Sequence, residues 1–206
     1  MAIAILLLFF TGNNSNSKKA DQRVTLKQQD KIPYGTYIAY NSLKDLFPRA
    51  AIFTDRSEPG YWDTLSLSKE NQALIIITGQ FNADETEMNR LISFVEQGNT
   101  VFISARTLSW KAGEILNCQV NTSAIPGLED VIPGDSLHLF LNAPPYVNRK
   151  GYFYSGKILD AGFLKVDKDI TEILGEDEKG RENFIHLSAG SGNLFIHLAP
   201  MAFTNN

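Results

Sequence analysis

Residues 73–106 read ALIIITGQFNADETEMNRLISFVEQGNTVFISAR and decide the fold of this chain. The apolar run 74–78 predicts a strand that is buried on both faces. Asp84, followed three residues later by Glu87, is typical of a capped helix N-terminus, and residues 100–104 return to a strand pattern. The segment therefore predicts a strand, helix, strand unit of a parallel sheet.

The flanking sequence continues this alternation. Residues 31–36, KIPYGT, predict a turn, with Thr36 capping the helix that follows. Alternation with short connections is typical of a mostly parallel, doubly wound sheet with helices on both faces, so an α/β fold is expected. The further elements predicted are strands at 23–26, 50–54 and 118–121, a helix at 108–117, and an apolar helical stripe facing the sheet, formed by Ala39, Leu43, Leu46 and Phe47.

The C-terminal part of the chain has a different pattern, in which short strands follow one another. Leu137, Leu139 and Leu141 alternate with polar residues, and residues 152–154 are aromatic. We predict a C-terminal antiparallel β extension of the main sheet, or a small β-subdomain. The expected organisation is an apolar leader and linker at 1–30 and a single α/β domain at 31–206, with its α/β core at 31–121 and its β-rich extension at 134–206.

A β-hairpin is predicted at the C-terminus, with residues 189–192 as its turn. The cross-strand pairs are then Ser188 with Asn193, His186 with Phe195, and Phe184 with His197. This register gathers apolar residues on one face, which is expected to be the core side. These residues are Ile185, Leu187, Leu194, Ile196 and Leu198.

The two histidines of this hairpin share its other face. His186 and His197 are expected to be diagonal neighbours, roughly 7–8 Å apart at Cα. A catalytic zinc site needs a third protein ligand, and none lies nearby in the sequence, so we reject these histidines as a metal site. Gly190 and Gly192 lie between two strands, whereas nucleotide-binding loops lie between a strand and a helix. No metal or cofactor is therefore expected.

The best candidate for a binding site is the turn after the first strand of the 73–106 unit, because open α/β sheets bind ligands at the carboxyl ends of their strands. Acidic residues at the helix start disfavour an anion there, whereas Gln80 and Asn82 are suited to a neutral polar ligand. Arg106 follows the second strand and either holds a carboxylate with its fixed donors or pairs with a local acid. The candidate ligand or partner edge comprises Gly79, Gln80, Asn82, Ser104, Arg106 and Asp55.

Ser104 is predicted to end the second strand, where a hydrolase would place its nucleophile. A nucleophile elbow requires glycines two residues before and after the serine, and this chain has Phe102 and Arg106 there. The single cysteine, Cys118, has apolar neighbours and is expected to be a core residue. No catalytic residue is therefore predicted. An alternative enzyme would assemble its site from loops, with Asp55, Arg106 and His138 as candidates.

An apolar run at residues 2–10 opens the chain. It is too short to cross a bilayer, which takes about 20 residues. It is a signal-peptide-like segment, the tail of a membrane helix whose beginning is missing, or an unstructured leader. We favour the membrane helix, because no basic residue precedes the run and no clear cleavage site follows it. Contact with a membrane is expected through this segment, although Lys18 and Lys19 favour a cytoplasmic domain.

The net charge of the 206-residue chain is −4, with acidic and basic residues interspersed. Nucleic acid is not an expected partner, because phosphate contacts require a concentrated Lys/Arg face. With one cysteine the chain cannot form an internal disulfide, so its fold must be stabilised by packing.

Three segments of the chain carry a family resemblance: residues 31–37, 73–105 and 183–205. The most specific parts are Pro33-Tyr34-Gly35-Thr36 and Phe203-Thr204-Asn205. Together they resemble a membrane-tethered bacterial domain-of-unknown-function family whose core is similar to the class I glutamine amidotransferase-like, flavodoxin-like α/β fold. The resemblance implies flanking transmembrane helices, a location outside the cytoplasm and no assigned activity. Class I amidotransferases carry a cysteine nucleophile at a glycine-flanked elbow, and Cys118 does not match that setting.

These observations favour a non-catalytic, envelope-associated binding or scaffold domain of a larger membrane protein or complex. It is expected to bind a protein partner or a small polar ligand at the carboxyl edge of its sheet. The alternative is a divergent hydrolase or amidotransferase-like enzyme with an unrecognised site, and a third hypothesis is a subunit of a membrane complex.

Overall fold

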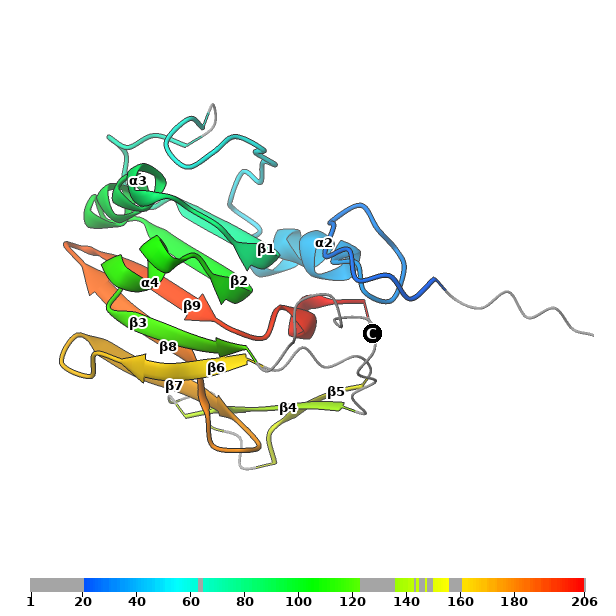
Figure 1. Cartoon of the computed structure of the whole chain (residues 1–206). Coiled ribbons are helices and arrows are strands. Elements are labelled where there is room, and N and C mark those ends of the chain that lie inside the picture. The colour runs from blue at the N-terminus through cyan, green and yellow to red at the C-terminus, as the bar shows by residue number, and fades with distance from the viewer. Residues whose placement is uncertain are drawn as a thin grey trace, which may run out of the picture.

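The computed structural model describes residues 21–62, 65–122, 136–142, 144, 147, 150–155 and 161–205. These residues form a curled sheet of seven strands in the order β1-β2-β9-β8-β7-β4-β5, beside a two-stranded sheet of β3 and β6 (Figure 1). The strands are β1 (Ala73–Phe81), β2 (Thr100–Leu108), β3 (Cys118–Thr122), β4 (Ser136–Leu141), β5 (Tyr152–Ser155), β6 (Ala161–Val166), β7 (Thr171–Asp177), β8 (Glu182–Ala189) and β9 (Gly192–His197). The helices are α2 (Tyr37–Leu46), α3 (Glu85–Glu96), α4 (Trp110–Ile115) and the 3-10 helix η1 (Pro200–Phe203).

The strand, helix, strand unit predicted from residues 73–106 is confirmed. Strands β1 and β2 are parallel neighbours, and α3 connects them. Asp84 caps α3 by accepting a hydrogen bond from Glu87 N at 2.8 Å, and Glu87 Oε2 accepts one from Asp84 N at 2.7 Å. Strand β2 continues to Leu108, however, so Ser104 lies within the strand and not at its end.

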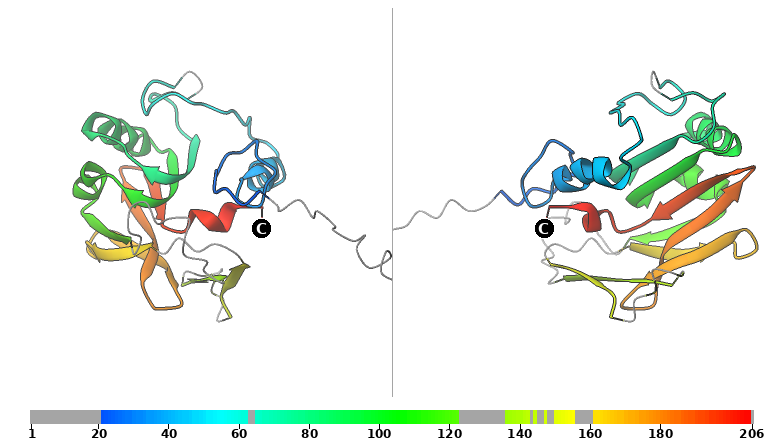
Figure 2. Two further views of the ribbon diagram at one scale, coloured as in Figure 1. Left: turned by 45° about the vertical axis from the view of Figure 1, so that its right-hand side comes forward. Right: turned by 180° about the vertical axis from the view of Figure 1, so that it is seen from behind.

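The predicted doubly wound α/β fold, with its class I glutamine amidotransferase-like core, is wrong. Only the β1–β2 and β2–β9 pairs are parallel, and from β9 to β5 every pair is antiparallel. Strand β3, which was expected to extend the parallel sheet, pairs with β6 in the separate small sheet. The main sheet curls, and α3, α4 and the small sheet lie against one of its faces (Figures 1 and 2). The described part of the chain is therefore β-rich, with three α-helices.

The position beside β2 is taken by the C-terminal hairpin, because its turn packs tightly against the end of α3. A side chain at Gly192 would collide with the carbonyl oxygens of Val95 and Asn99, and one at Gly190 would collide with that of Glu96. Gly190 also has a φ of +57°, which glycine adopts without strain. The two glycines thus permit both the turn and the close approach that seats β9 in the sheet.

The predicted register and core face of the hairpin are confirmed. Phe184 pairs with His197, His186 with Phe195, and Ser188 with Asn193. The five apolar residues of the predicted core face are all buried. They join α3, α4, β2 and the small sheet in the main core, where Cys118 also lies. Burial raises the pKa of the Cys118 thiol to about 11, so this cysteine is a core residue as predicted.

Helix α2 is present, but its predicted apolar stripe does not face the sheet. None of its residues is buried, and Leu46 and the following Phe47 are 68% and 51% exposed. Residues 50–54 and 23–26 form no strand. Helical periodicity shows which face of a helix is apolar, but it does not show that a neighbour covers that face.

The two most specific family segments contact each other at the start of α2. Thr36 does not cap the helix, because its hydroxyl donates to Leu26 O at 3.1 Å. Asn205 caps it instead: its Oδ1 accepts from Ile38 N at 2.9 Å. Its Nδ2 donates to Asp30 O at 2.9 Å and to Ile32 O at 2.7 Å. Asn205 therefore connects the segment after η1 to the N-terminal turn through hydrogen bonds.

Replacing Asn205 by alanine should lower the free energy of unfolding by about 2 kcal/mol, because a helix cap and two backbone acceptors lose their partner. Urea denaturation measures this loss. Asn41→Ala is the matched control, since Asn41 is exposed and donates only to Tyr37 O of its own helix; a change below about 0.5 kcal/mol is expected there. Equal stability changes in the two variants would contradict the assigned role of Asn205.

The expected membrane segment finds no counterpart. In the ranges that the structure describes, no helix is long and apolar enough to cross a membrane. The apolar run 2–10, on which that expectation rested, lies outside the described residues. The prediction of a membrane partner through a spanning helix is corrected accordingly.

Candidate functional site

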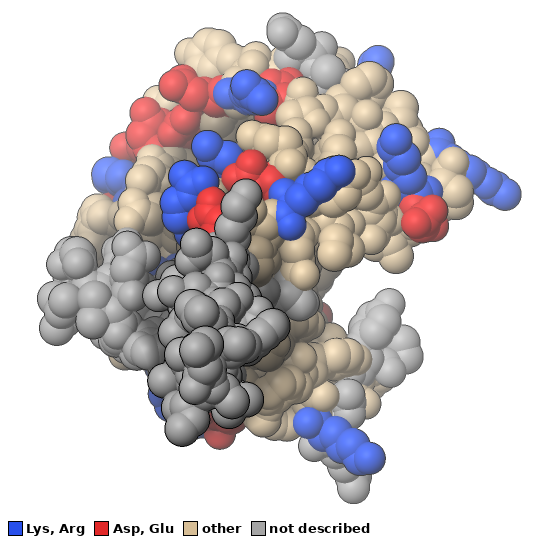
Figure 3. Space-filling model, turned by 90° about the vertical axis from the view of Figure 1, so that its right-hand side faces the viewer, with Lys and Arg blue, Asp and Glu red and all other residues tan. Residues whose placement is uncertain are grey.

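A pocket lined mainly by aromatic and aliphatic side chains lies inside the curl of the main sheet. Its volume is about 330 Å³, at the small end of the range of about 300–1,000 Å³ that is typical of ligand sites. The space-filling view of this end of the molecule shows a hollow whose coloured walls are mainly uncharged (Figure 3). The lining residues are Phe102 of β2, Leu139 and Leu141 of β4, Tyr152 and Tyr154 of β5, Phe184 of β8, His197 of β9, and Ala202 and Phe203 of η1.

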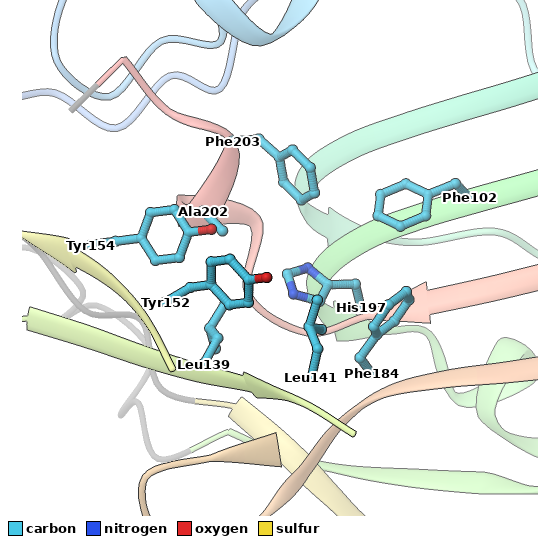
Figure 4. Close-up of a pocket in the computed structure, with 9 residues that line it drawn as sticks. All are labelled: Phe102, Leu139, Leu141, Tyr152, Tyr154, Phe184, His197, Ala202 and Phe203. Atoms are coloured by element: carbon cyan, nitrogen blue, oxygen red, sulfur yellow. The ribbon is translucent and has the colours of Figure 1, made fainter. Parts of the chain in front are cut away.

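The curl of the sheet brings these distant segments together. Strands β2, β9 and β8 form one wall of the pocket, β4 and β5 form the opposite wall, and η1 adds Ala202 and Phe203 (Figure 4). In β2, Phe102 and Ser104 alternate with the core residues Val101 and Ile103, so the pocket face and the core face follow directly from the strand period. The pocket therefore lies on the side of the sheet opposite α3.

His197 is the most deeply placed polar group of the pocket wall. Its side chain is surrounded by three aromatic rings: Phe102 stacks on it at 6.3 Å, and Phe184 and Phe203 meet it edge-on at 5.3 and 5.6 Å. Only 7% of the residue is exposed. Burial lowers the pKa of His197 to about 4, so the imidazole is neutral at pH 7.

Ser104 lies beside His197 on the neighbouring strand and contacts its ring. The two residues are direct cross-strand partners in the parallel β2–β9 pair, and Ser104 Oγ lies 3.0 Å from His197 Nδ1. Ser104 is fully buried. Ser104 and His197, which were considered separately in the sequence, are thus joined by a hydrogen bond at the pocket wall.

This pair does not have the arrangement of a catalytic serine and its base. His197 lines the pocket, whereas Ser104 is fully buried and does not line it, so a substrate in the pocket would meet the imidazole and not the serine. Ser104 also lies within regular β2, and the left-handed backbone positions found among described non-glycine residues are Leu26, Asn71 and Asn117. Without an exposed serine on a strained turn, there is no nucleophile elbow.

The other residues of the predicted edge are only partly brought together. Gly79 lies opposite Arg106, between the pairs Thr78–Ala105 and Gln80–Thr107. Arg106 was expected at an accessible edge of the sheet, but only 5% of the residue is exposed. The residue has interactions within the fold. Gln80 and Asn82 are exposed. Asp55 accepts a hydrogen bond from Ser57 N at 2.8 Å and is half-buried in the loop before β1.

His186 and His197 share a face of the hairpin but contact different groups. His186 Nδ1 lies 3.1 Å from Glu172 Oε2, and its Nε2 lies 2.9 Å from Asn193 Oδ1. His138, a candidate of the enzyme alternative, lies 3.4 Å from Glu178 Oε2. Within the described part of the chain, no three metal-ligating side chains gather at one point.

The sequence analysis missed the pocket, although one signal for it was present. The predicted hairpin register already placed Phe184 beside His197 on the face opposite the core. The contributions of β4, β5 and η1 depend on the curl of the sheet, which the local sequence does not encode.

Comparison with known proteins finds solved structures that resemble part of this chain. One similar solved structure is the exo-beta-1,4-mannosidase Op5Man5 from Opitutaceae bacterium strain TAV5, with 15% sequence identity, a TM-score of 0.42, and coverage of 64% of this chain and 21% of that one. Another is the beta-galactosidase from Bacillus circulans sp. alkalophilus, with 14% identity, a TM-score of 0.43, and coverage of 68% and 22%. The chain thus spans about a fifth of the length of these proteins. No curated protein matches it.

A family model matches residues 28–206 of this chain. This match confirms the expected domain-of-unknown-function membership, while the membrane tether and the amidotransferase-like core that were expected with it find no support. The chain therefore belongs to the family described as "Domain of unknown function (DUF4350)".

Proposed function

We propose that this protein is a non-catalytic binding domain and that its ligand occupies the pocket around His197. The observation that carries the proposal is a neutral, buried histidine set among aromatic rings in a cavity of about 330 Å³. Concave, mostly apolar sites with a few fixed polar groups are typical of ligand binding. The small volume favours a small molecule or a single side chain of a partner.

The chemistry of the pocket wall favours an uncharged ligand. Among the described lining residues, none has an acidic or basic side chain other than the neutral His197. A charged group would lose its hydration in such a pocket and gain no opposite charge there. A ring-bearing ligand would gain contact area and edge-to-face packing with the surrounding rings.

An enzymatic function receives less support. Among the described residues the Ser104–His197 hydrogen bond is the feature that favours it, but the serine is fully buried and does not line the pocket. The pair therefore supports a role in which Ser104 fixes the ring that contacts the ligand.

A titration of uncharged aromatic compounds, followed by NMR, tests the proposed site. We expect chemical-shift changes at Phe102, His197 and Phe203. Ala202→Leu should weaken binding at least tenfold, because Ala202 lines the pocket and a larger side chain would fill it (Figure 4). Ala50→Leu is the matched control, since Ala50 is exposed and outside the pocket. Binding that is absent, or that survives Ala202→Leu, would refute the proposal.

A further inference from the structure

The hydrogen atoms of the Ser104–His197 pair can be assigned from their partners. Ser104 Oγ is buried, and within the described chain its one hydrogen-bond partner is His197 Nδ1. A buried hydroxyl that fails to donate carries a substantial free-energy cost. Ser104 therefore donates to Nδ1, which must be the unprotonated nitrogen of the ring.

The remaining ring proton of the neutral imidazole then lies on Nε2. No group in the described residues accepts a hydrogen bond from this nitrogen, and it is not one of the fully buried side-chain atoms that lack a partner, so it is accessible to solvent. His197 lines the pocket, so the N–H is available to a group inside it. The Tyr152 hydroxyl, from the opposite wall, points toward the same ring (Figure 4). Two donors thus point toward one region of a largely apolar pocket, whose lining also includes Tyr154.

We propose that the pocket binds an uncharged aromatic ligand that carries a carbonyl oxygen, which accepts hydrogen bonds from His197 Nε2–H and the Tyr152 hydroxyl. A carbonyl oxygen has two lone pairs and can accept from both donors at once. The aromatic part of the ligand packs among the rings of the pocket wall. Ser104 is a positioning residue, because it fixes the tautomer and orientation of His197. This inference rests on the proposed function and adds the ligand class.

Three small probes of similar shape separate the contributions of the aromatic ring, the carbonyl oxygen and a negative charge to binding. Acetophenone has the ring and the carbonyl, ethylbenzene has the ring alone, and benzoate has the ring with a negative charge. Acetophenone should bind about fivefold more tightly than ethylbenzene, which corresponds to one net hydrogen bond. Benzoate should bind most weakly, because its charge loses hydration in the pocket.

The outcomes distinguish the two levels of the proposal. If none of the three probes binds in the pocket, the proposed function itself fails. If acetophenone and ethylbenzene bind equally, the pocket is a binding site but the carbonyl assignment is wrong. If benzoate binds most tightly, a cation contributes to the site and the assignment of an uncharged ligand is overturned.

The role of Ser104 has a readout that requires no ligand. In histidine-labelled protein, ¹⁵N chemical shifts of the imidazole report which nitrogen carries the proton, and the His197→Asn variant identifies the signal by its loss. We expect protonated Nε2 and unprotonated Nδ1 in the unsubstituted protein. Ser104→Ala should produce a mixture of tautomers and reduce the preference for acetophenone to less than about twofold. A proton on Nδ1 in the unsubstituted protein would overturn the assignment.

Discussion

Replacing Asn99 by alanine should lower the free energy of unfolding by about 4 kcal/mol, because the substitution breaks a buried side-chain network that joins α3 to the segment before β1. The Asn99 side chain is fully buried at the end of α3. Its Nδ2 donates to Phe94 O at 2.9 Å and to Lys69 O at 2.8 Å, and its Oδ1 accepts from Gln72 N at 2.9 Å. Alanine would leave all three backbone groups without these partners.

The backbone of Asn99 adds a link to the hairpin. Its carbonyl oxygen accepts from Asn193 N at 3.0 Å, at the start of β9. Asn99 thus connects the last turn of α3, the segment that enters β1, and the strand that carries His197. The alanine variant keeps this backbone link, so the expected loss of stability comes from the side-chain hydrogen bonds alone.

Denaturant unfolding of Asn99→Ala measures the effect, and Ser191→Ala is its control. Ser191 lies in the adjacent hairpin turn, is exposed, and makes one long hydrogen bond to Glu96 O at 3.4 Å. Its replacement should change the stability by less than about 0.5 kcal/mol. A loss below about 1 kcal/mol for Asn99→Ala would show that the network is not a major source of stability.

Local features of the fold were predictable because they depend on neighbouring residues. The capping box at Asp84 and Glu87 and the strand on either side of α3 follow from short sequence patterns. The hairpin register follows from its turn and from strict alternation of apolar residues. In these places the sequence pattern and the tertiary structure agree.

The order of strands was not predictable from the same patterns. A strand, helix, strand unit is compatible with any parallel neighbour at β2, and the chain uses β9, which lies about ninety residues later in the sequence. The absence of a side chain at Gly192 permits this pairing, because the backbone there closely approaches Val95 and Asn99. Those glycines were interpreted only as turn residues, because their second contact is with a distant segment.

The candidate site was missed for the same reason. Ser104 and His197 were each singled out, and the pocket face of the hairpin was predicted, but the two residues meet only once β9 pairs with β2. Arg106 and Gly79 do lie opposite each other on adjacent strands, yet Arg106 is buried. The pairing of β2 with β9 brings Ser104 and His197 together, and the curl of the sheet then adds the residues of β4, β5 and η1.

Acidification from pH 7 to pH 4 should lower the free energy of unfolding by on the order of 3 kcal/mol through His197 alone. In the folded protein burial among aromatic rings lowers the pKa of this histidine from 6.5 to about 4. In the unfolded chain the imidazole is solvated and takes up its proton near pH 6.5. Between these two values the unfolded state binds more protons than the folded state, so stability falls as the pH decreases through this window.

Carboxylates also titrate in this range, so the effect of His197 must be measured as a difference between two proteins. His197→Asn removes the titrating ring and places an amide oxygen near the former Nδ1, where it can still accept from Ser104. Urea denaturation at pH 7, 5.5 and 4.5 should show a steeper loss for the unsubstituted protein, because only its folded state resists protonation at this position. Parallel stability curves for the two proteins would mean that His197 is protonated in the fold without penalty. The ring would then be charged in weak acid, and the pocket would favour an anionic ligand in place of an uncharged one.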